Sequence, residues 1–417
     1  MTDTVSTHVD TTSTIRLGAW YDDRAVQLEF PSSWRVIHCP PRDAADIGDD
    51  GIRAAFDQPI GTPRLRELAA GKRRPCIVID DLSRPTQGRR LVPAVLDELQ
   101  HAGIDAKDVL LLGGTANHRQ MTRRDWDLKV GLDVLERCNV SQHFSWDNCV
   151  PLGTTSFGSP VEVNAEFMAS DLKILVGSII PHGAAGFSGG SKLLMPGVTS
   201  VDSAEAYHRG VGMRGRYAVV ETDARLESDE AARMAGVDFL VNSVPNSTLG
   251  IGGLVTGDVV HAHRAGVQIA RRIFASPTPT GCDVAVLSLY PKDTEFTQHL
   301  TAFAPWATAP ERIVREGGTI VVALDGSEGF GFHSLMGPGR RIENRRPTQI
   351  KGRSLVFFSP HVDRGCMIPE VRESVELYRT WEATRAALEA EHGDGAVVAV
   401  YPCATMQLAE AVCDDRA

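Results

Sequence analysis

The chain has 417 residues, enough for two or three domains, and its 42% hydrophobic and 23% charged content is that of an ordinary soluble protein. A net charge of −10 argues against nucleic acid and anionic membranes as partners, and no apolar run reaches membrane-spanning length. The eight cysteines form no Cys-x-x-Cys pair, which argues against a zinc knuckle or a disulfide framework and favours reduced thiols in a cytoplasmic protein.

The N-terminal part combines a polar leader with short elements. Residues 1–14 are Thr-rich and lack an apolar h-region, so we expect a disordered leader and not a signal peptide. Weak alternation predicts a hairpin over residues 15–28 and a short strand over residues 34–39. Residues 63–70 read as a short amphipathic helix that ends at Gly71.

Polar residues follow the first strongly apolar strand, residues 76–79. The sequence DDLSRPT (residues 80–86) comes just past the carboxyl end of that strand, where open α/β sheets bind ligands. Pro85 biases Arg84 toward an extended conformation, and a guanidinium can grip a carboxylate through two parallel hydrogen bonds. The alternative is a surface Asp–Arg pair in a turn.

A strand–helix–strand unit continues the pattern. Apolar spacing predicts a helix over residues 91–102, and the next strand, residues 109–112, runs into the sequence GGTANHRQMT. His118 in this sequence is a candidate catalytic residue, or else a turn histidine bonded to backbone. Charged residues 123–138 suit a helix, and residues 161–168 read as a strand.

The central stretch begins with a buried strand over residues 172–180. It continues with PHGAAGFSGGSK (residues 181–192) and, three residues later, MPG. Glycine lets backbone approach a ligand closely, and successive N–H groups can face an anion. Lys192 could pair with phosphate, or act as a nucleophile if its pKa falls. This is not a P-loop, because Ser191 stands where that motif needs glycine, and an ordinary turn is the alternative.

The pattern PH-x-x-AGFSGG-x-K-x-x-x-PG resembles the signature of the nickel-pincer lactate racemase family. In that family the lysine carries a covalently attached pyridinium-3,5-bisthiocarboxylic acid mononucleotide, which holds nickel through two sulfurs and a ring carbon. The family's metal-binding histidine lies on the following segment, which here is a helix expected over residues 201–209. The resemblance therefore implies cofactor contacts and one nickel ligand at these positions: Lys192, Ser188, Gly189 and Gly190, and His208.

Two upstream segments carry the same resemblance. DDLSRPT is similar to the family's Asp-Asp-x-Thr-Arg-Pro, which implies that Arg84 binds the substrate carboxylate with Asp81 close by. The sequence from His118 to Thr122 resembles the family's Gly-Thr-His-Arg-Pro-Met-Thr, although Ala116-Asn117 is inserted before the histidine and Gln120 replaces proline. The resemblance implies that the two catalytic acid–bases are His118 and His182.

Two histidines and a Pro-rich stretch follow. His261 and His263 could share one face of a strand and bind a second metal, but no carboxylate or cysteine stands at ligand spacing, so a helix-face role is favoured. Residues 276–281 (SPTPTG) predict a domain boundary. We therefore expect an N-terminal α/β domain over residues 15–276, carrying the lysine and histidines, and a C-terminal domain over 277–417 whose last residues could pack back on the first.

The C-terminal part repeats an α/β pattern. Strands are expected over residues 284–289, 319–324, 354–359 and 396–400, and helices over residues 305–315 and 371–391. The predicted fold is two α/β domains with mainly parallel sheets and the active site in the cleft between them.

The residues after the strand at 284–289 bear on the substrate. The family shows Asp-x-x-x-Tyr-Gln-x-x-Lys here; Asp293 and Gln298 match, but Thr297 and Thr301 replace the tyrosine and the lysine. Losing a cation weakens the grip on a simple carboxylate, and losing a ring enlarges the pocket. With Gln298 and Thr301 as substrate-binding residues, we expect a 2-hydroxy acid larger or more polar than lactate: a sugar acid, or an aryl or dicarboxylic hydroxy acid.

Inverting C2 of such an acid requires breaking its C–H bond. The neighbouring carboxylate resists a carbanion, whereas hydride removal avoids that charge. The resemblance implies a nickel-dependent racemase or epimerase that couples hydride transfer to proton transfer and is loaded by separate maturation enzymes. Two alternatives stay open: a non-catalytic protein that binds the nickel-pincer nucleotide, and a metal-free enzyme in which Lys192 forms a Schiff base.

Overall fold

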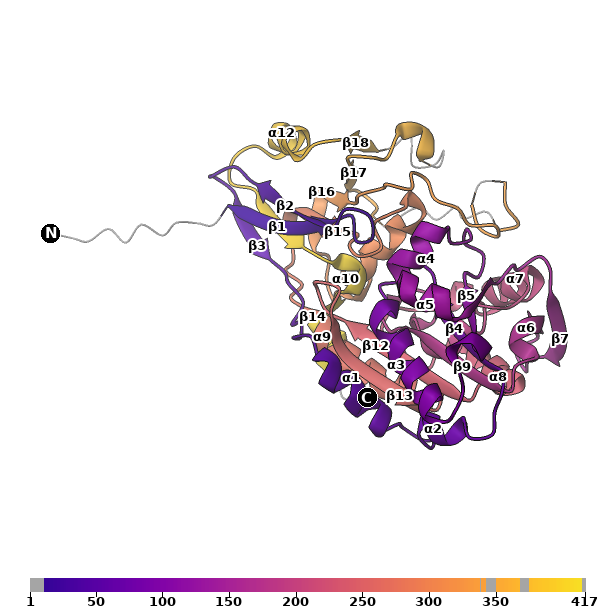
Figure 1. Cartoon of the computed structure of the whole chain (residues 1–417). Coiled ribbons are helices and arrows are strands. Elements are labelled where there is room, and N and C mark those ends of the chain that lie inside the picture. Colours follow the sequence, from indigo (N-terminus) through magenta and orange to yellow (C-terminus); the bar gives the residue numbers. More distant parts are fainter. Residues whose placement is uncertain (1–10, 338, 343–349, 368–374, 415–417) are drawn as a thin grey trace. The chain divides into compact units, whose positions relative to one another are not determined.

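The computed structural model describes residues 11–337, 339–342, 350–367 and 375–414, and Figure 1 labels its helices and strands. The chain forms two compact units. Unit 1 comprises the segment up to Pro41, Ser276–Gly331 and Arg345–Ala411; unit 2 comprises Arg42–Ala275, Phe332–Asn344 and the C-terminal residues from Val412. Within the described ranges, no helix is both long enough and apolar enough to cross a bilayer.

Unit 2 is built on a six-stranded sheet with the order β13-β12-β9-β4-β5-β6. Neighbouring strands are parallel except β12 and β13. Every residue of β4 and of β12 is buried, as expected where helices cover both faces of a parallel sheet. The strands are β4 (Pro75–Asp80), β5 (Leu110–Gly114), β6 (Asn139–Gln142), β9 (Leu172–Ser178), β12 (Phe239–Pro245) and β13 (Ile251–Gly257).

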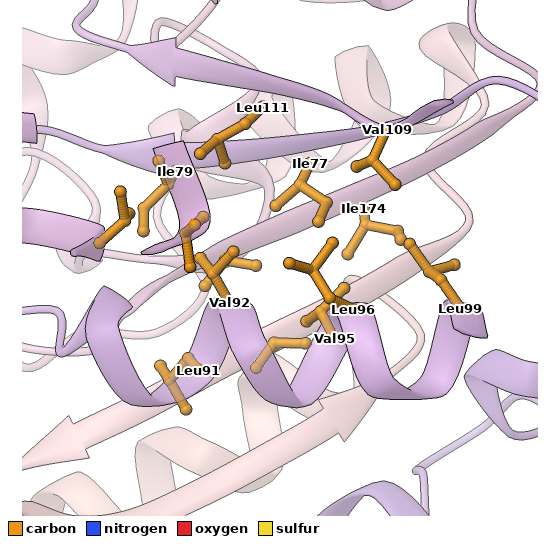
Figure 2. Packing of buried hydrophobic residues seen from close by; sticks show 14 of the residues in the cluster. Ile77, Ile79, Leu91, Val92, Val95, Leu96, Leu99, Val109, Leu111 and Ile174 are labelled. Atoms are coloured by element: carbon orange, nitrogen blue, oxygen red, sulfur yellow. The ribbon is translucent and has the colours of Figure 1, made fainter. Parts of the chain in front are cut away.

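Helix α3 (Gly88–His101) shows how the sheet is covered. Its apolar side chains recur at helical spacing, and Figure 2 shows Val92, Leu96 and Leu99 pointing toward the side chains of the strands, among them Ile77 of β4. Each such buried side chain contributes about 1.5–3 kcal/mol relative to exposure. The remaining helices of unit 2 are α1 (Gly48–Asp57), α2 (Leu65–Leu68), α4 (Arg123–Val130), α5 (Leu132–Arg137), α6 (Ala165–Met168), α7 (Val201–Gly210), α8 (Asp223–Ala235) and α9 (His261–Phe274).

The order of the strands creates a switch point in unit 2. From β4 the chain adds β5 and β6 on one side, then returns to add β9, β12 and β13 on the other. The connections after β4 and β9 therefore leave in opposite directions, which opens a crevice at the carboxyl ends of these two strands. Two hairpins complete the unit: β7 (Cys149–Thr154) with β8 (Pro160–Asn164), and β10 (Pro181–His182) with β11 (Gly186–Phe187).

Unit 1 contains a second six-stranded sheet, parallel throughout, with the order β18-β17-β16-β15-β19-β3. The hairpin of β1 and β2 packs on this sheet, because Ile15, Leu17 and Leu28 join one hydrophobic cluster with Val284 and Val321. Its elements are β1 (Thr12–Leu17), β2 (Arg24–Glu29), β3 (Arg35–His38), β15 (Cys282–Ser288), α10 (Ala304–Thr308), β16 (Val314–Ala323), β17 (Ser354–Phe358), β18 (Glu376–Tyr378), α12 (Trp381–His392), β19 (Val397–Tyr401) and β20 (Leu408–Ala409), with β14 (Ala275–Ser276) and α13 (Glu410–Asp414) at its boundaries.

The mixed α/β class with mainly parallel sheets is therefore as predicted, but the expected domain range is corrected at the N-terminus. Residues 15–41 belong with unit 1, because β3 pairs with β19 at the edge of that sheet. The division at residues 275 and 276 lies at the expected boundary. At the other end, Asp414 forms an ion pair with Arg42 of unit 2, with an Nη1–Oδ1 distance of 2.8 Å.

Several predicted elements also differ. Residues 161–168 change from strand to helix at Asn164, whose side chain accepts from the Phe167 amide and caps α6. The helix expected over 305–315 stops at Thr308, and Val314 already begins β16. The helix expected over 123–138 is divided by Gly131, which has a φ of +89°. Of the helix expected over 371–391, residues 371–374 lie outside the described ranges, 376–378 form β18, and α12 starts at Trp381 after its cap Thr380.

Candidate active site

A pocket of about 70 Å³ lies at the switch point of unit 2. Its walls come from the segments that follow β4, β5 and β9, and from the glycine-rich stretch predicted from the sequence. The lining residues used below are Asp80, Asp81, Ser83, Arg84, His118, Ser178, Ser188, Gly189 and Lys192.

Asp81 and His118 form an ion-paired dyad on one wall. The Oδ2 atom of Asp81 lies 3.1 Å from Nδ1 of His118. Burial alone would raise the pKa of Asp81, but His118 and Arg84 outweigh it and hold that pKa well below its usual range. An ionised Asp81 accepts the Nδ1–H of His118, so the lone pair of a neutral His118 lies on Nε2. His118 therefore has the arrangement of a general base oriented by a carboxylate.

The turn after β4 is fixed by short hydrogen bonds. The Asp81 carboxylate accepts from the backbone N–H and the hydroxyl of Ser83, at 2.8 and 2.5 Å. Arg84 in turn donates from Nη1 to Oγ of Ser83 at 2.8 Å. Below the turn, the fully buried Lys129 pairs with Asp80 at 2.7 Å and donates to the carbonyls of Asp81 and Arg84. The guanidinium of Arg84 is thus held at the pocket by a rigid turn.

Lys192 presents an amine in the pocket wall. It lies on a short 3₁₀ segment (Gly190–Leu193), is 9% exposed, and its Nζ is 3.4 Å from Oη of Tyr207. Burial, reinforced by the cations Arg225 and Arg84, lowers the pKa of Lys192 well below its ordinary value. A lowered pKa favours the uncharged amine, which is the nucleophilic form.

Buried side chains hold the glycine-rich stretch from behind. Arg225 of α8 donates to the carbonyl oxygens of Gly189, at 2.9 Å, and Phe187. His263 donates from Nε2 to the carbonyl of Ser188 at 2.9 Å, which gives it a structural role on the buried face of α9. The Ser188 hydroxyl is itself used inside the loop, since it donates to the Ser178 carbonyl and accepts from the Ile180 amide.

Gly189 and Gly190 adopt left-handed backbone, with φ values of +71° and +59°. A Cβ on Gly189 would lie 2.5 Å from Oδ1 of Asn242, which already accepts the Gly190 N–H at 2.6 Å. Only glycine fits this turn, so the loop conformation is determined by close packing as well as by backbone freedom.

His182 and His208 are not among the residues that line the pocket, and backbone contacts indicate which of their ring nitrogens carries the proton. His182 Nδ1 accepts from the amides of Ala184 and Ala185, at 3.1 and 3.4 Å, so its neutral ring carries the proton on Nε2. His208 Nδ1 lies 2.6 Å from the carbonyl of Ala204 one helical turn earlier, which places the lone pair on Nε2, the usual arrangement for a metal ligand.

The structure thus brings six predicted residues to one pocket, whereas His182, Gly190 and His208 are not among its lining residues. Gln298 and Thr301 lie in unit 1, on a 3₁₀ helix (Phe296–Phe303), where Gln298 donates to Glu295 at 2.9 Å and Thr301 donates to the Gln298 carbonyl at 2.8 Å. In the part of the chain that the structure describes, no three His, Cys, Asp or Glu side chains gather as a metal site.

Comparisons with known proteins now decide the family. Residues 21–218 match the family model for the lactate racemase N-terminal domain. The chain is 31% identical over 383 residues to a lactate racemase of Lactiplantibacillus plantarum, covering 84% of this chain and 88% of the relative. It is also 32% identical over 291 residues to a lactate racemase of Thermoanaerobacterium thermosaccharolyticum, covering 68% and 67%.

The chain belongs to the lactate racemase family.

Solved structures agree on the fold of this lactate racemase family member. The lactate racemase apoprotein of Thermoanaerobacterium thermosaccharolyticum superposes with a TM-score of 0.72 at 22% identity, over 95% of this chain and all of that one. A crystal structure of a protein from Thermotoga maritima gives a TM-score of 0.64 at 14% identity, over 85% and 97%. At these identities the likeness concerns the fold alone.

Three side chains of this family member could hold a covalent group and a metal. Lys192 offers its amine, and His208 offers Nε2. Ser178 offers a hydroxyl that lines the pocket and is buried without a hydrogen-bond partner among the described residues. A buried orphan hydroxyl at a pocket wall is a feature that a bound polar group would satisfy.

Sequence reasoning missed four residues of this site. Lys129 could have been noticed, because a lysine between Trp126 and Val130 on the buried side of α4 needs a buried partner. Arg225 and His333 had none, since each reaches the site from a segment distant in sequence. Tyr207 was passed over although it adjoins His208, and the centroid of its ring lies 5.1 Å from Nζ of Lys192.

Proposed function

We propose that this chain is an isomerase: a racemase or epimerase that inverts C2 of a 2-hydroxy acid, with a nickel-pincer nucleotide attached to Lys192. One observation carries the proposal. The switch-point pocket combines an amine of lowered pKa (Lys192), a guanidinium suited to a carboxylate (Arg84) and an imidazole oriented by an ionised aspartate (His118 with Asp81).

Substrate binding in this proposal depends on Arg84. Its guanidinium can accept a carboxylate in the bidentate geometry that fixes both position and orientation. Because the Ser83 hydroxyl accepts from the guanidinium and the Lys129 ammonium donates to the Arg84 carbonyl, little side-chain entropy is lost on binding. The anchored carboxylate places the C2 hydroxyl of the acid near His118.

Proton transfer falls to two histidines of opposite tautomer. Nε2 of His118 takes the hydroxyl proton of one enantiomer, and Asp81 stabilises the imidazolium that results. Nε2 of His182 carries a proton and can return one to the other face, so the two rings exchange roles when the reaction runs backward. When bound, the nickel-pincer group supplies the hydride acceptor and donor for C2.

The residues present suit this cofactor. The Lys192 amine would hold it covalently, the unpartnered Ser178 hydroxyl and the backbone of Ser188, Gly189 and Gly190 would line it, and His208 would be the protein ligand to nickel. Imidazole is a suitable nickel donor. We further propose that separate maturation enzymes build and load the cofactor.

The substrate is proposed to differ from lactate. The relatives are named for lactate, whereas Thr297 and Thr301 replace the tyrosine and lysine that the family shows at these positions. With the lysine cation gone, a sugar acid, an aryl or a dicarboxylic hydroxy acid is the better candidate, with Gln298 and Thr301 in its binding site.

A substrate panel tests the proposal. Protein co-expressed with cofactor-maturation enzymes should contain nickel and a sulfur-bearing mass adduct on Lys192, and should racemise larger 2-hydroxy acids with a higher kcat/KM than lactate. Lactate giving the highest kcat/KM would contradict the substrate assignment. Adduct and nickel without turnover would indicate a cofactor-binding protein.

The lowered pKa of the Lys192 amine also favours a second candidate, a metal-free Schiff-base enzyme. Borohydride trapping separates the two. A carbonyl substrate or pyridoxal phosphate would be reduced onto Lys192 in nickel-free, active protein, whereas the proposed racemase should be inactive without nickel.

A further inference from the structure

A third histidine, His333, lies beside the base. Residues 332–337 pack within unit 2, where His333 forms an antiparallel β-bridge with His118. The two ring centroids are 5.2 Å apart and the rings are tilted by 58°. No hydrogen bond joins these two rings among the described residues, so His333 adjoins the general base without engaging its nitrogens.

One of the two residues inserted before His118, Asn117, holds the segment of residues 332–337 in place by hydrogen bonds. The Asn117 carbonyl accepts the Ser334 N–H at 2.7 Å, and its Oδ1 accepts the hydroxyls of Ser334 and Ser145, at 3.1 and 3.2 Å. Ala116 adopts a left-handed φ of +51°, a conformation that costs a non-glycine residue about 1 kcal/mol or more. The buried Asn117 thus holds the segment that carries His333.

The segment is also fixed to the helix that carries His208. Leu335 is fully buried in a cluster with Val201 and Ala204 of α7. Arg341, a few residues further on, pairs with Asp202 of the same helix at 2.5 Å. The segment that carries His333 is therefore held by Asn117 on one side and by helix α7 on the other.

The orientation of the His333 ring leaves one donor available. Its Nδ1 accepts from the amides of Met336 and Leu335, at 2.9 and 3.3 Å, so the proton lies on Nε2. Among the described residues, no group pairs with that Nε2. Burial, together with His118 and His208, holds the pKa of His333 well below its usual range, so the ring stays neutral.

From this arrangement we infer that His333 determines specificity: its Nε2–H donates a hydrogen bond to an oxygen that the substrate carries on C3 or beyond. Resting on the proposed function, this narrows the substrate to polyhydroxylated or dicarboxylic 2-hydroxy acids and disfavours aliphatic and aryl ones. A site built to pair a substrate oxygen discriminates strongly against analogues without one, because its donor is then left unpaired.

The test compares variants of the holoenzyme on gluconate, malate and 2-hydroxybutyrate. His333→Phe keeps a planar ring but removes the donor, and should lower kcat/KM for the preferred oxygen-bearing acid about ten- to hundredfold relative to 2-hydroxybutyrate, mainly through KM. His333→Gln, which retains a donor, should recover part of the preference. Met336→Leu is the matched control, because its amide still bonds Nδ1. Whichever of gluconate and malate loses more identifies a hydroxyl or a carboxylate as the acceptor.

Calorimetric binding of the same acids gives a readout independent of turnover. The wild type should bind an oxygen-bearing acid more tightly than 2-hydroxybutyrate, and His333→Phe should lose that preference at unchanged Lys192 adduct content. A wild type without the preference, or a His333→Phe variant that retains it, would overturn the inference. If the wild type binds selectively but inverts none of the acids, the proposed racemase activity fails and the role of His333 stands.

Discussion

The chemistry of the site depends on which ring nitrogen of each histidine carries the proton. Asp81 assigns the proton of His118 to Nδ1, while two backbone amides assign that of His182 to Nε2. One imidazole is therefore ready to accept a proton and the other to donate one. Such a pair suits a reaction that must deprotonate either enantiomer.

Asp81→Asn tests the first of these assignments. An amide can donate to Nδ1 and so stabilise the wrong tautomer of His118, with the proton on Nε2. We expect kcat to fall by about 10³- to 10⁴-fold, while the adduct on Lys192 is retained by intact mass. Ser83→Ala, which removes a partner of Asp81 but leaves its carboxylate, should lose far less. Equal activity in Asp81→Asn and wild type would disprove the dyad.

The lowered pKa of Lys192 makes a separate prediction about pH. An amine whose folded pKa is lowered loses its proton at a lower pH than an ordinary lysine, so its reactivity should rise less steeply above pH 7. The reference is Lys107, whose side chain is 73% exposed. In the cofactor-free protein, the ratio of cyanate carbamylation at Lys192 to that at Lys107 should therefore fall from pH 7 to 9. Peptide mass spectrometry measures it, and a constant ratio would contradict the shift.

The candidate site residues that the sequence could indicate are those within a recognisable motif. Asp81, Arg84 and Lys192 were found because each belongs to a run of residues whose order carries information. His333 could not be found, since its relation to His118 is a β-bridge between positions about two hundred residues apart. The insertion of Ala116 and Asn117 was visible, but its effect depended on that same distant contact.

Among the elements, α8 is the one on which the glycine-rich stretch depends most. It buries Arg225 completely, and burial lowers the pKa of this guanidinium only to about 10, so it stays charged. Its two carbonyl partners belong to the buried residues Phe187 and Gly189. A helix that looks alanine-rich and unremarkable in sequence thus fixes the loop next to Lys192.

Arg225→Met should therefore be strongly destabilising. Two buried carbonyls would lose a charged donor, at about 1–3 kcal/mol each, and Asp229 would lose a neighbouring cation. We expect a lower midpoint in urea unfolding and less adduct on Lys192. Arg233→Met, at an exposed position of the same helix, should stay within about 0.5 kcal/mol of wild type. Similar losses in both variants would show that α8 acts only as a general support.

Elements were predictable where periodicity and length agreed. The strands around residues 76–79, 109–112 and 172–178 were continuous apolar runs, and the structure has them. The strand predicted over residues 161–168 was wrong in its second half, because Asn164 caps a helix and the chain changes from strand to helix there. The helix predicted over residues 371–391 was wrong at residues 376–378, which form an edge strand. A strand of three residues shows no periodicity in the sequence, and its conformation depends on pairing with β17.

For the whole molecule, the sequence predicted two α/β units but misassigned the N-terminal segment. Strand β3 has four residues and pairs with β19, more than 350 residues further along the chain. Only tertiary pairing could reveal that partnership. A second link joins the same segment to unit 1, because buried Asp293 accepts the amides of Gly18 and Ala19, at 2.7 and 3.3 Å.

Asp293 should make the stability of unit 1 fall as pH rises. Burial raises the pKa of Asp293 to about 7, with Asp325 adding to the effect and the two amides opposing it. In the unfolded chain the pKa of an aspartate is about 4. The folded state then binds the extra proton between these values, so its stabilising contribution is complete below about pH 4 and is lost through about pH 7. Asp293→Asn should flatten the pH dependence of urea unfolding over this window, whatever its effect on absolute stability. The control is Asp22→Asn, at an exposed position of the N-terminal segment that bonds Asp293, and it should leave the slope unchanged. Parallel pH profiles for Asp293→Asn and wild type would mean that this carboxylate is ionised in the folded protein, held by the two amides.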